Sequence, residues 1–267
     1  MKFLNGNELV GFIKQRQAHQ VRGLIQHDKI QPKLAIITTK DDPVINIYMD
    51  LKKAYGADIL IDAEIFRVGQ GAELEQKIAQ LNADQFVTGI ILQLPLENPA
   101  ETDQYVTKID PRKDVDGLGS DQFFVPATAM AVDWLVNGYN IELLGKKIAI
   151  VGQNGRLVGR PLMKLWEKYQ PTGFGRDDDL RRLRTFDIVV SATGSAAVIK
   201  PEMLGLDAVL IDAGTVSENG KIVGDADPSL YNRQDLTITP PTGGVGPLTV
   251  AALFDNVIKA ARLNVDK

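Results

Sequence analysis

The sequence contains no cysteine and only two histidines, His19 and His27, among its 267 residues. Without cysteine the chain has no disulfide, no thiolate metal ligand and no thiol nucleophile, which suits a reducing compartment. A serine–histidine triad or a histidine-based zinc site would depend on these two residues, and both lie in the polar N-terminal region. We therefore expect no metal, and we expect any catalysis to use other side chains.

The chain also lacks an excess of charge of one sign and long hydrophobic runs. Its net charge is −4, and basic residues are interspersed with acidic ones. A basic stripe would indicate nucleic-acid binding, and a basic amphipathic helix a membrane surface. No apolar run approaches the length of a membrane span, and the segment "MKFLNGNELVGFIKQ" lacks the apolar core of a signal peptide. We expect a cytoplasmic protein with a small-molecule substrate, and no nucleic-acid or membrane partner.

Strand-like apolar segments alternate with helical patterns along the chain, in two series. The first series has three expected strands, at 33–39, 63–68 and 89–94. Helical patterns separate them, at 43–55 and 72–81. After a charged loop at 110–121 and a helix at 127–139, the second series has four expected strands, at 146–152, 187–194, 208–214 and 236–240. Such alternation is typical of βαβ units and predicts an α/β fold with parallel sheets.

The second series opens with "IAIVGQNGRLVGRPL", which runs from a strand through a glycine-bearing turn into a helix. Glycines there allow close approach of a pyrophosphate, and the helix start offers free N–H groups. The spacing of Gly152, Gly155 and Gly159 is not the strict dinucleotide fingerprint, so a plain βα turn remains an alternative. The run Asp177 to Asp179 stands where a ribose-binding acid is expected, but it fits a solvated helix cap equally well.

In the first series, Tyr48 and Lys52 are four residues apart, so they share one face of the expected helix. Gln93 ends an apolar strand, and Asp116 follows on the loop "KDVDG". Later, "PPTGGVGPLTVAAL" places paired glycines before a helix, which suits close approach of a flat ligand. The plain alternative for the tyrosine and lysine is an exposed helix surface.

The motifs Y-x-x-x-K, "QLPL", "DVDG", "VGRP", "GKIVGDAD" and "GGVGPLTVAAL", in this order, resemble the bifunctional methylenetetrahydrofolate dehydrogenase/cyclohydrolase family. The resemblance implies an N-terminal folate and catalytic domain at 1–122, joined by the C-terminal helix 246–267. It also implies a Rossmann-type domain at 123–245, with one cleft between the domains. The implied enzyme oxidises methylene-tetrahydrofolate with NADP, NAD not being excluded, and hydrolyses the methenyl product to formyl-tetrahydrofolate. A homodimer and a place in purine biosynthesis are implied as well.

The resemblance also implies roles for individual residues. Lys52 would handle the proton in hydrolysis, because a shielded amine beside a cationic substrate loses its charge more easily. Gln93 would orient that amine, Tyr48 would stack on the folate, and Asp116 would bind the amino edge of the pterin. The further folate-binding residues implied are Leu92, Leu94, Pro95, Gly243, Gly244, Val245, Gly246 and Pro247. The coenzyme-binding residues implied are Gly152, Gln153, Asn154, Gly155, Arg156, Gly159, Gly175, Arg176 and Thr215.

The chain departs from the family pattern at five places, four of them on the coenzyme side or its approaches. Ile45 replaces a serine, "PATAMA" replaces P-C-T-P-x-G, and the G-R-S turn is one residue longer, as "GQNGR". Phe174 and Gly175 stand for a His-Ser pair, and Thr242 stands for a proline. These changes keep two alternatives open: a cyclohydrolase without dehydrogenase activity, and a folate-binding homologue without turnover.

Overall fold

The computed structural model describes residues 1–119, 123–218 and 221–263. Its chain divides into two compact units. The first unit comprises residues 1–10 and 128–249, and the second comprises 11–127 and 250–267. The border predicted between residues 122 and 123 adjoins 120–122, which lie outside the described residues, as do 264–267 of the predicted last helix.

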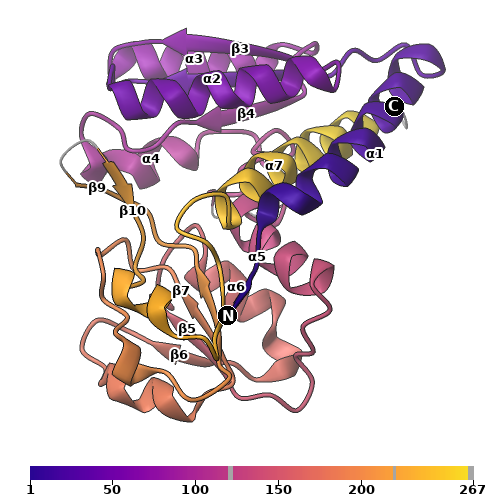
Figure 1. The fold of residues 1–267 in the computed structure, drawn as a ribbon. Coiled ribbons are helices and arrows are strands. Elements are labelled where there is room, and N and C mark those ends of the chain that lie inside the picture. Colours follow the sequence, from indigo (N-terminus) through magenta and orange to yellow (C-terminus); the bar gives the residue numbers. More distant parts are fainter. Residues whose placement is uncertain (120–122, 219–220, 264–267) are drawn as a thin grey trace. The chain divides into compact units, whose positions relative to one another are not determined.

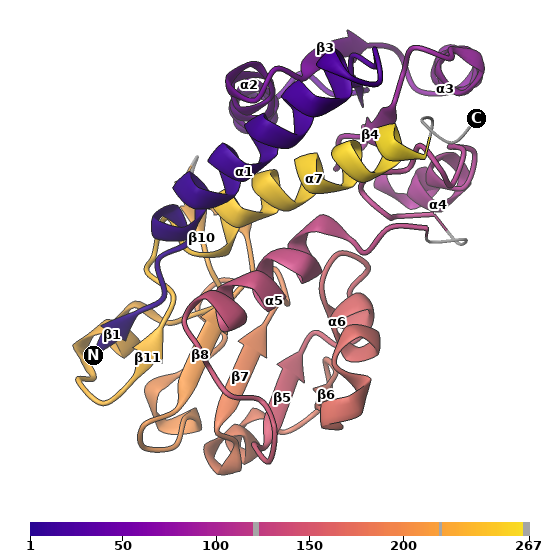
Figure 2. The ribbon, with the colours of Figure 1, turned by 90° about the vertical axis from the view of Figure 1, so that its right-hand side faces the viewer.

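The second unit is built on a three-stranded parallel sheet in the order β3-β2-β4 (Figure 1). Its strands are β2 (Lys33–Thr38), β3 (Asp62–Arg67) and β4 (Gly89–Leu92). The crossover helices α2 (Pro43–Asp58) and α3 (Ala72–Ala83) lie on opposite faces of this sheet (Figure 2). The connection from β2 to β3 and the connection from β3 to β4 run in opposite directions across the sheet. Because such crossovers are right-handed, their two helices must lie on opposite faces.

The core of this unit follows from the alternation of side chains along β2. Ala35 and Ile37 point to the α3 face, where they join a buried cluster with Leu74 and Ile78. Leu34 and Ile36 are also fully buried, so the strand is covered on both faces. This explains the continuous apolar run in its sequence, which is typical of a parallel strand between helices.

Two long helices, α1 (Gly6–Gln26) and α7 (Val245–Arg262), run side by side in both views (Figures 1 and 2). Within the second unit, the buried Gln17 donates a hydrogen bond to the carbonyl of Ala251, at 2.8 Å. Gln17 also accepts one from the hydroxyl of Tyr55 on α2, at 2.8 Å. The Tyr55 ring stacks on Phe254 with centroids 5.2 Å apart. One buried polar group therefore ties α1, α2 and α7 together.

The first unit contains a six-stranded sheet in the order β1-β11-β8-β7-β5-β6, in which every pair is parallel. Its strands are β1 (Lys2–Phe3), β5 (Ile148–Val151), β6 (Thr172–Phe174), β7 (Ile188–Ser191), β8 (Val209–Asp212) and β11 (Thr237–Ile238). The helices α5 (Ala127–Gly138) and α6 (Gly159–Leu165) belong to the same stretch of chain, and β9 (Val216–Glu218) pairs antiparallel with β10 (Lys221–Val223). Short helical turns and α4 (Thr102–Val106) complete the two units.

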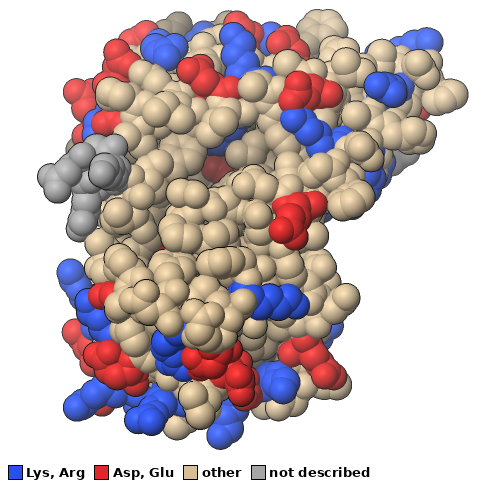
Figure 3. Space-filling view, viewed as in Figure 1, with Lys and Arg blue, Asp and Glu red and all other residues tan. Residues whose placement is uncertain are grey.

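The expected α/β fold with parallel sheets and two domains is confirmed. The strand β6 has only three residues, and its sequence contains a glycine, which is unfavourable in a strand. The helix α1 was not among the predicted elements. On the face drawn in Figure 3, acidic and basic side chains are interspersed, in keeping with the small net charge.

Candidate active site and coenzyme turn

The helix α2 fixes Tyr48 and Lys52 on one face of the second unit. Its N-cap, Asp42, accepts hydrogen bonds from the backbone N–H groups of Val44 and Ile45, at 2.9 and 3.2 Å, and Pro43 occupies the first helical turn. This cap satisfies N–H groups that have no partner within the helix. Ile45 is buried in the helix's core-facing stripe, so the residue that replaces the family's serine packs in the core.

The amine of Lys52 is held by Gln93, which follows β4. Lys52 Nζ donates a hydrogen bond to Gln93 Oε1 over 2.6 Å. The other end of the amide is fixed too, because Gln93 Nε2 donates to the carbonyl of Leu94 at 2.9 Å. The backbone N–H of Gln93 continues the β4–β2 ladder by donating to the carbonyl of Ile37 at 2.8 Å. The oxygen of the amide therefore faces Lys52, and the sheet determines where it stands.

Burial shifts the titration of the charged groups in this site. It lowers the pKa of Lys52, and the negative charge of Asp116 partly opposes that shift. Burial raises the pKa of Asp116, and the positive charge of Lys52 opposes that shift. Burial also raises the pKa of the half-buried Tyr48. The site thus combines an amine that loses its proton more readily than a surface lysine with a carboxylate and a phenol.

The loop that carries Asp116 is held by a second acid, Asp114, which the sequence analysis left out. Asp114 is buried and accepts hydrogen bonds from the N–H groups of Gly117 and Gly119, at 3.1 and 2.7 Å. Burial raises the pKa of Asp114 to about 6. Glycine at three and five residues after an aspartate is the local signal that indicates such a turn, and "DVDGLG" contains it.

A residue of α7 adds a second anchor to the same loop. Asn256 is buried, and its Nδ2 donates to the carbonyls of Val115 and Val125, at 2.9 and 3.0 Å. Val115 also packs closely against Gly89, where a β-carbon would lie within 2.8 Å of its side chain. Backbone on both sides of the loop is therefore fixed by buried groups. No periodic pattern in the sequence indicates that Asn256 contacts residues so distant along the chain.

The other predicted folate-binding residues fall in two places. Leu92 ends β4, and Leu94 and Pro95 follow Gln93 with a cis peptide bond between them. Gly243 to Pro247 belong to the first unit. There the carbonyl of Gly243 accepts a hydrogen bond from the N–H of Gly6 at 2.8 Å. A β-carbon on Gly243, which has φ +83°, would overlap the side chain of Asn7. The paired glycines thus leave room for the first residues of α1 to pack against them, whereas the sequence predicted only a folate-binding role for these glycines.

The predicted coenzyme turn links β5 to α6 in the first unit. Gly152 has φ +84°, and a β-carbon there would come within 2.5 Å of the carbonyl oxygen of Ala192. A β-carbon on Gly159 would overlap the carbonyl oxygen of Gly152. The N–H of Gly155 donates to the carbonyl of Gly152 at 2.8 Å, which closes the turn. The backbone is compact here, and the N–H groups of Arg160 and Leu162 donate to the carbonyls of Gly155 and Val158, at 2.9 and 2.8 Å.

The remaining predicted coenzyme residues lie in this turn, after β6 and after β8. Gln153 covers β6, since a β-carbon on Gly173 would overlap its amide. The carbonyl of Asn154 accepts a hydrogen bond from Arg160 Nε at 3.0 Å. Burial and the charge of Arg160 lower the pKa of Arg156. Gly175 and the exposed Arg176 follow β6, and the exposed Thr215 follows β8.

The acidic residues after β6 accept hydrogen bonds from nearby backbone N–H groups. Asp178 accepts a hydrogen bond from the N–H of Gly175 at 2.6 Å. Asp179 accepts from the N–H of Arg181 at 3.0 Å, caps the following helical turn and forms an ion pair with the Arg181 side chain. This is the helix-cap role that the sequence left open beside ribose binding.

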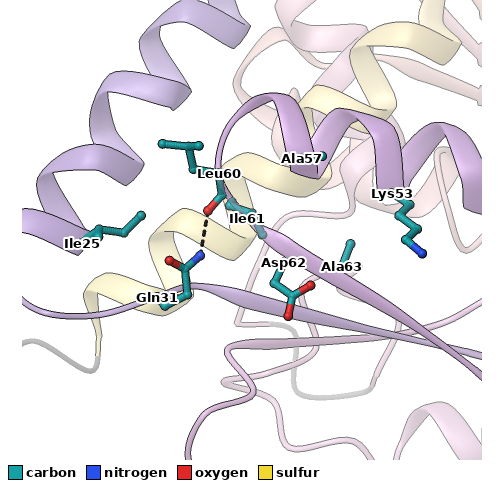
Figure 4. A pocket seen from close by; sticks show the side chains of 8 residues that line it. All are labelled: Ile25, Gln31, Lys53, Ala57, Leu60, Ile61, Asp62 and Ala63. Atoms are coloured by element: carbon teal, nitrogen blue, oxygen red, sulfur yellow. Dashed lines mark hydrogen bonds between the residues drawn. The ribbon is translucent and has the colours of Figure 1, made fainter.

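A neighbouring lysine on α2 lies in a different place from Lys52. Lys53 is exposed and lines a hollow of about 380 Å³ together with Gln31, Leu60 and Asp62 (Figure 4). Gln31 Nε2 donates to the carbonyl of Leu60 across this hollow, at 2.8 Å (Figure 4). Two adjacent lysines of one helix therefore differ in burial and in partners, which makes Lys53 a matched control for Lys52.

Two further searches concern the described residues alone. Within residues 1–119, 123–218 and 221–263, no group of three or more His, Cys, Asp or Glu side chains could hold a metal ion. In the same part of the chain, no helix combines the length and the apolar character needed to cross a membrane.

Comparison with known proteins assigns both halves of the chain to one family. The family model "tetrahydrofolate dehydrogenase/cyclohydrolase, catalytic domain" matches residues 4–116. The model for the family's NAD(P)-binding domain matches residues 126–265. The bifunctional protein FolD of Lactobacillus helveticus is 34% identical over 282 residues, which cover 100% of this chain and 99% of the relative.

Solved structures agree with the sequence matches. The bifunctional FolD dehydrogenase/cyclohydrolase of Campylobacter jejuni is 29% identical with a TM-score of 0.90, covering 99% of each chain. The Trypanosoma brucei enzyme, solved in complex with NADP cofactor and inhibitor, is 26% identical with a TM-score of 0.90, covering 99% of this chain and 98% of that one. This chain belongs to the tetrahydrofolate dehydrogenase/cyclohydrolase family.

Proposed function

We propose that this protein oxidises methylene-tetrahydrofolate to methenyl-tetrahydrofolate with NADP and hydrolyses the product to formyl-tetrahydrofolate. The observation that carries the proposal is the pairing of Lys52 with Gln93 over 2.6 Å, in a chain that matches both domains of a bifunctional family. A folate-binding protein without turnover has no use for an amine whose pKa is lowered and whose orientation is fixed. The geometry therefore favours an enzyme.

In the proposed hydrolysis, water attacks the cationic methenyl carbon and loses a proton as the new C–O bond forms. The neutral amine of Lys52 takes up or relays that proton, and burial lowers its pKa in the direction this role requires. The hydroxyl of the adduct then gives up its second proton as it becomes the formyl carbonyl and the carbon–nitrogen bond breaks. The folate nitrogen that leaves takes up one proton, so the whole step releases one proton. Gln93 Oε1 accepts an N–H of Lys52, so the lone pair of the amine points away from the amide.

Asp116 and Tyr48 complete the proposed folate site. Asp116 would accept hydrogen bonds from the amino edge of the pterin, and Asp114 and Asn256 hold its loop in place. Tyr48 lies one helical turn before Lys52 and would stack on the folate ring system. Because both groups act through position, the rigidity of their supporting backbone matters as much as their chemistry.

For the oxidation, the residues present fit a nicotinamide dinucleotide. The compact turn from Gly152 to Gly159 links β5 to α6, which is the place where a Rossmann-type fold holds a pyrophosphate. A bound nicotinamide would supply the acceptor for the hydride of methylene-tetrahydrofolate. NADP is the expected coenzyme, supported by the NADP complex of the Trypanosoma brucei relative. The protein's part in this step is to position two rings.

The test is an assay of the purified protein with methylene-tetrahydrofolate and either NADP or NAD, and separately with methenyl-tetrahydrofolate. We expect coenzyme reduction in the first assay and hydrolysis above the uncatalysed rate in the second. Hydrolysis without reduction of either coenzyme would identify a cyclohydrolase without dehydrogenase activity. The longer coenzyme turn at Gln153 is the feature that would explain such a loss. Absence of both activities, with folate still bound, would identify a binding homologue.

Three finer predictions are a homodimer, a cytoplasmic location and a role in purine biosynthesis. The family resemblance implies the first and the last, and the sequence features described above imply the second. The first is tested by sedimentation of the purified protein, which should give twice the mass of the chain. The other two need localisation in cells and growth of a deletion strain with and without purines.

A further inference from the structure

A fully buried carboxylate, Asp225, lies beneath the loops that follow β7. Its Oδ2 accepts hydrogen bonds from Ser191 Oγ and from the N–H of Thr193, each at 2.6 Å. Its Oδ1 accepts one from the N–H of Ser195 at 3.2 Å. The side chain of Asp225 is 0% exposed, as is Ser191. One carboxylate thus fixes the last residue of β7 and both ends of the turn around Gly194.

A second carboxylate, Asp212 at the end of β8, holds Asp225 itself. Asp212 Oδ1 accepts hydrogen bonds from the backbone N–H groups of Asp225 and Gly214, at 3.1 and 2.9 Å. Asp212 Oδ2 accepts from the N–H of Ala226 at 2.8 Å. A β-carbon on Gly214 would overlap the carboxylate of Asp225. The two acids and this glycine form one interlocked unit, in which backbone N–H groups compensate buried negative charge.

The segment from Gly224 to Asp227 is placed by backbone pairing. The N–H of Ile199 donates to the carbonyl of Asp225, and the N–H of Asp227 donates to the carbonyl of Ile199, each at 2.9 Å. This segment therefore runs along the chain that follows β7. The carboxylate of Asp225 reaches the carboxyl end of β7, and Asp212 at the end of β8 binds the backbone of the segment. The carboxyl ends of the strands form the edge where open parallel sheets bind their ligands.

We propose that Asp225 is a positioning residue for the nicotinamide coenzyme: it holds the loop Thr193–Ser195 and, with Asp212, the turn at Gly214 in the shape that the coenzyme requires. The inference rests on the proposed dehydrogenase function. Asp225 is not a catalytic residue, because it lies beneath the loops and its oxygens are occupied by their N–H groups. Its effect on the coenzyme is exerted through backbone that would otherwise have several conformations.

The hydrolytic reaction provides an internal control for this proposal, because it needs no coenzyme. A change that only loosens the strand-end loops should weaken coenzyme binding and leave hydrolysis of methenyl-tetrahydrofolate intact. General loss of folding would lower both activities together. The ratio of the two effects therefore separates positioning from simple structural damage.

The experiment compares Asp225→Asn, Ser191→Ala and the control Asp227→Asn. In Asp225→Asn, an NH₂ group replaces one acceptor oxygen and faces at least one N–H or hydroxyl donor. We expect the Kd for NADP, measured by calorimetry, and the KM for the coenzyme to rise roughly tenfold, since an unmatched buried donor weakens the arrangement it supports. Ser191→Ala removes one hydrogen bond and should give a smaller rise in the same direction.

The control lies in the same segment, but its carboxylate has other partners. Asp227 pairs with Lys200 at 2.6 Å and accepts from the N–H of Ser229 at 2.9 Å. Asp227→Asn should leave the Kd for NADP unchanged within twofold. All three variants should keep the wild-type rate of methenyl-tetrahydrofolate hydrolysis.

Three results would overturn the inference, and they are distinguishable. If wild-type protein binds NADP or NAD while Asp225→Asn binds it with the same Kd, the positioning role is wrong and the proposed function stands. If wild-type protein binds neither coenzyme, the proposed dehydrogenase function fails and the positioning role fails with it. A fall in hydrolysis equal to the loss in coenzyme affinity would show a purely structural role.

Discussion

Replacement of Lys52 by methionine tests the proposed proton transfer most directly. Methionine has nearly the length of lysine and keeps its apolar stem, but it has no amine to take up a proton. General acid–base catalysis contributes about 10²- to 10⁴-fold to a rate. We therefore expect Lys52→Met to hydrolyse methenyl-tetrahydrofolate slower by that factor, which corresponds to about 3 to 5 kcal/mol of transition-state stabilisation.

The same structure predicts little loss of stability in this variant. Burial lowers the pKa of Lys52, so the folded state binds fewer protons than the unfolded chain at pH values between the two pKa values. The contribution of Lys52 to stability accordingly rises with pH through that window, and below the upper pKa the burial of this amine opposes folding. Methionine removes that cost and leaves Gln93 Oε1 without its donor, which costs about 1 kcal/mol at a half-buried site. The two changes oppose each other.

The assay is a rate measurement on three proteins: wild type, Lys52→Met and Lys53→Met. Lys53 is exposed and adjacent, so its replacement removes the same charge from the same helix without touching Gln93. Chemical denaturation should give all three a free energy of unfolding within about 1 to 2 kcal/mol of each other. A Lys52→Met protein that retains more than about a tenth of the wild-type rate, with folding intact, would refute proton transfer by this amine.

Three further predictions concern folding. Burial raises the pKa of Asp114 in the folded state to about 6 from 3.8, so protonation of this residue stabilises the fold fully below pH 4 and this stabilisation is lost as pH rises through 6. In Asp114→Asn, the change in the free energy of unfolding between pH 4 and pH 7 should be smaller by roughly 2 to 3 kcal/mol. Urea titration at each pH measures it. Tyr55→Phe leaves a buried acceptor of Gln17 without its donor and should cost about 1 to 2 kcal/mol by the same method, and an unchanged midpoint would contradict the three-helix tie. Gly23→Ala places a methyl group in open space on α1 and should stabilise the protein by roughly 0.5 to 1 kcal/mol, whereas destabilisation would show an unexpected contact.

Much of the fold could be predicted from local sequence, because strand and helix periods differ and each period is set by a few neighbouring residues. The apolar runs at β2, β4, β5 and β7 each became a buried parallel strand. Asp42 and Pro43 set the start of α2 by chemistry that acts within a single turn. By contrast, α1 was not predicted, and its buried Gln17 shows that it is held by packing against α2 and α7.

The sequence by itself also determined that Tyr48 and Lys52 share a helix face, since a spacing of four residues fixes that in any α-helix. It could not determine that Lys52 meets Gln93, which is 41 residues away, or that Asn256 holds the backbone of Val115. Nor could it show that Asp225 is fully buried beneath Ser191. These contacts depend on strand order and helix packing, which join residues distant along the chain, and no local period encodes such pairings. Local sequence thus determined the helices and strands, and only the tertiary structure determined which polar groups are buried and which of them form hydrogen bonds with one another.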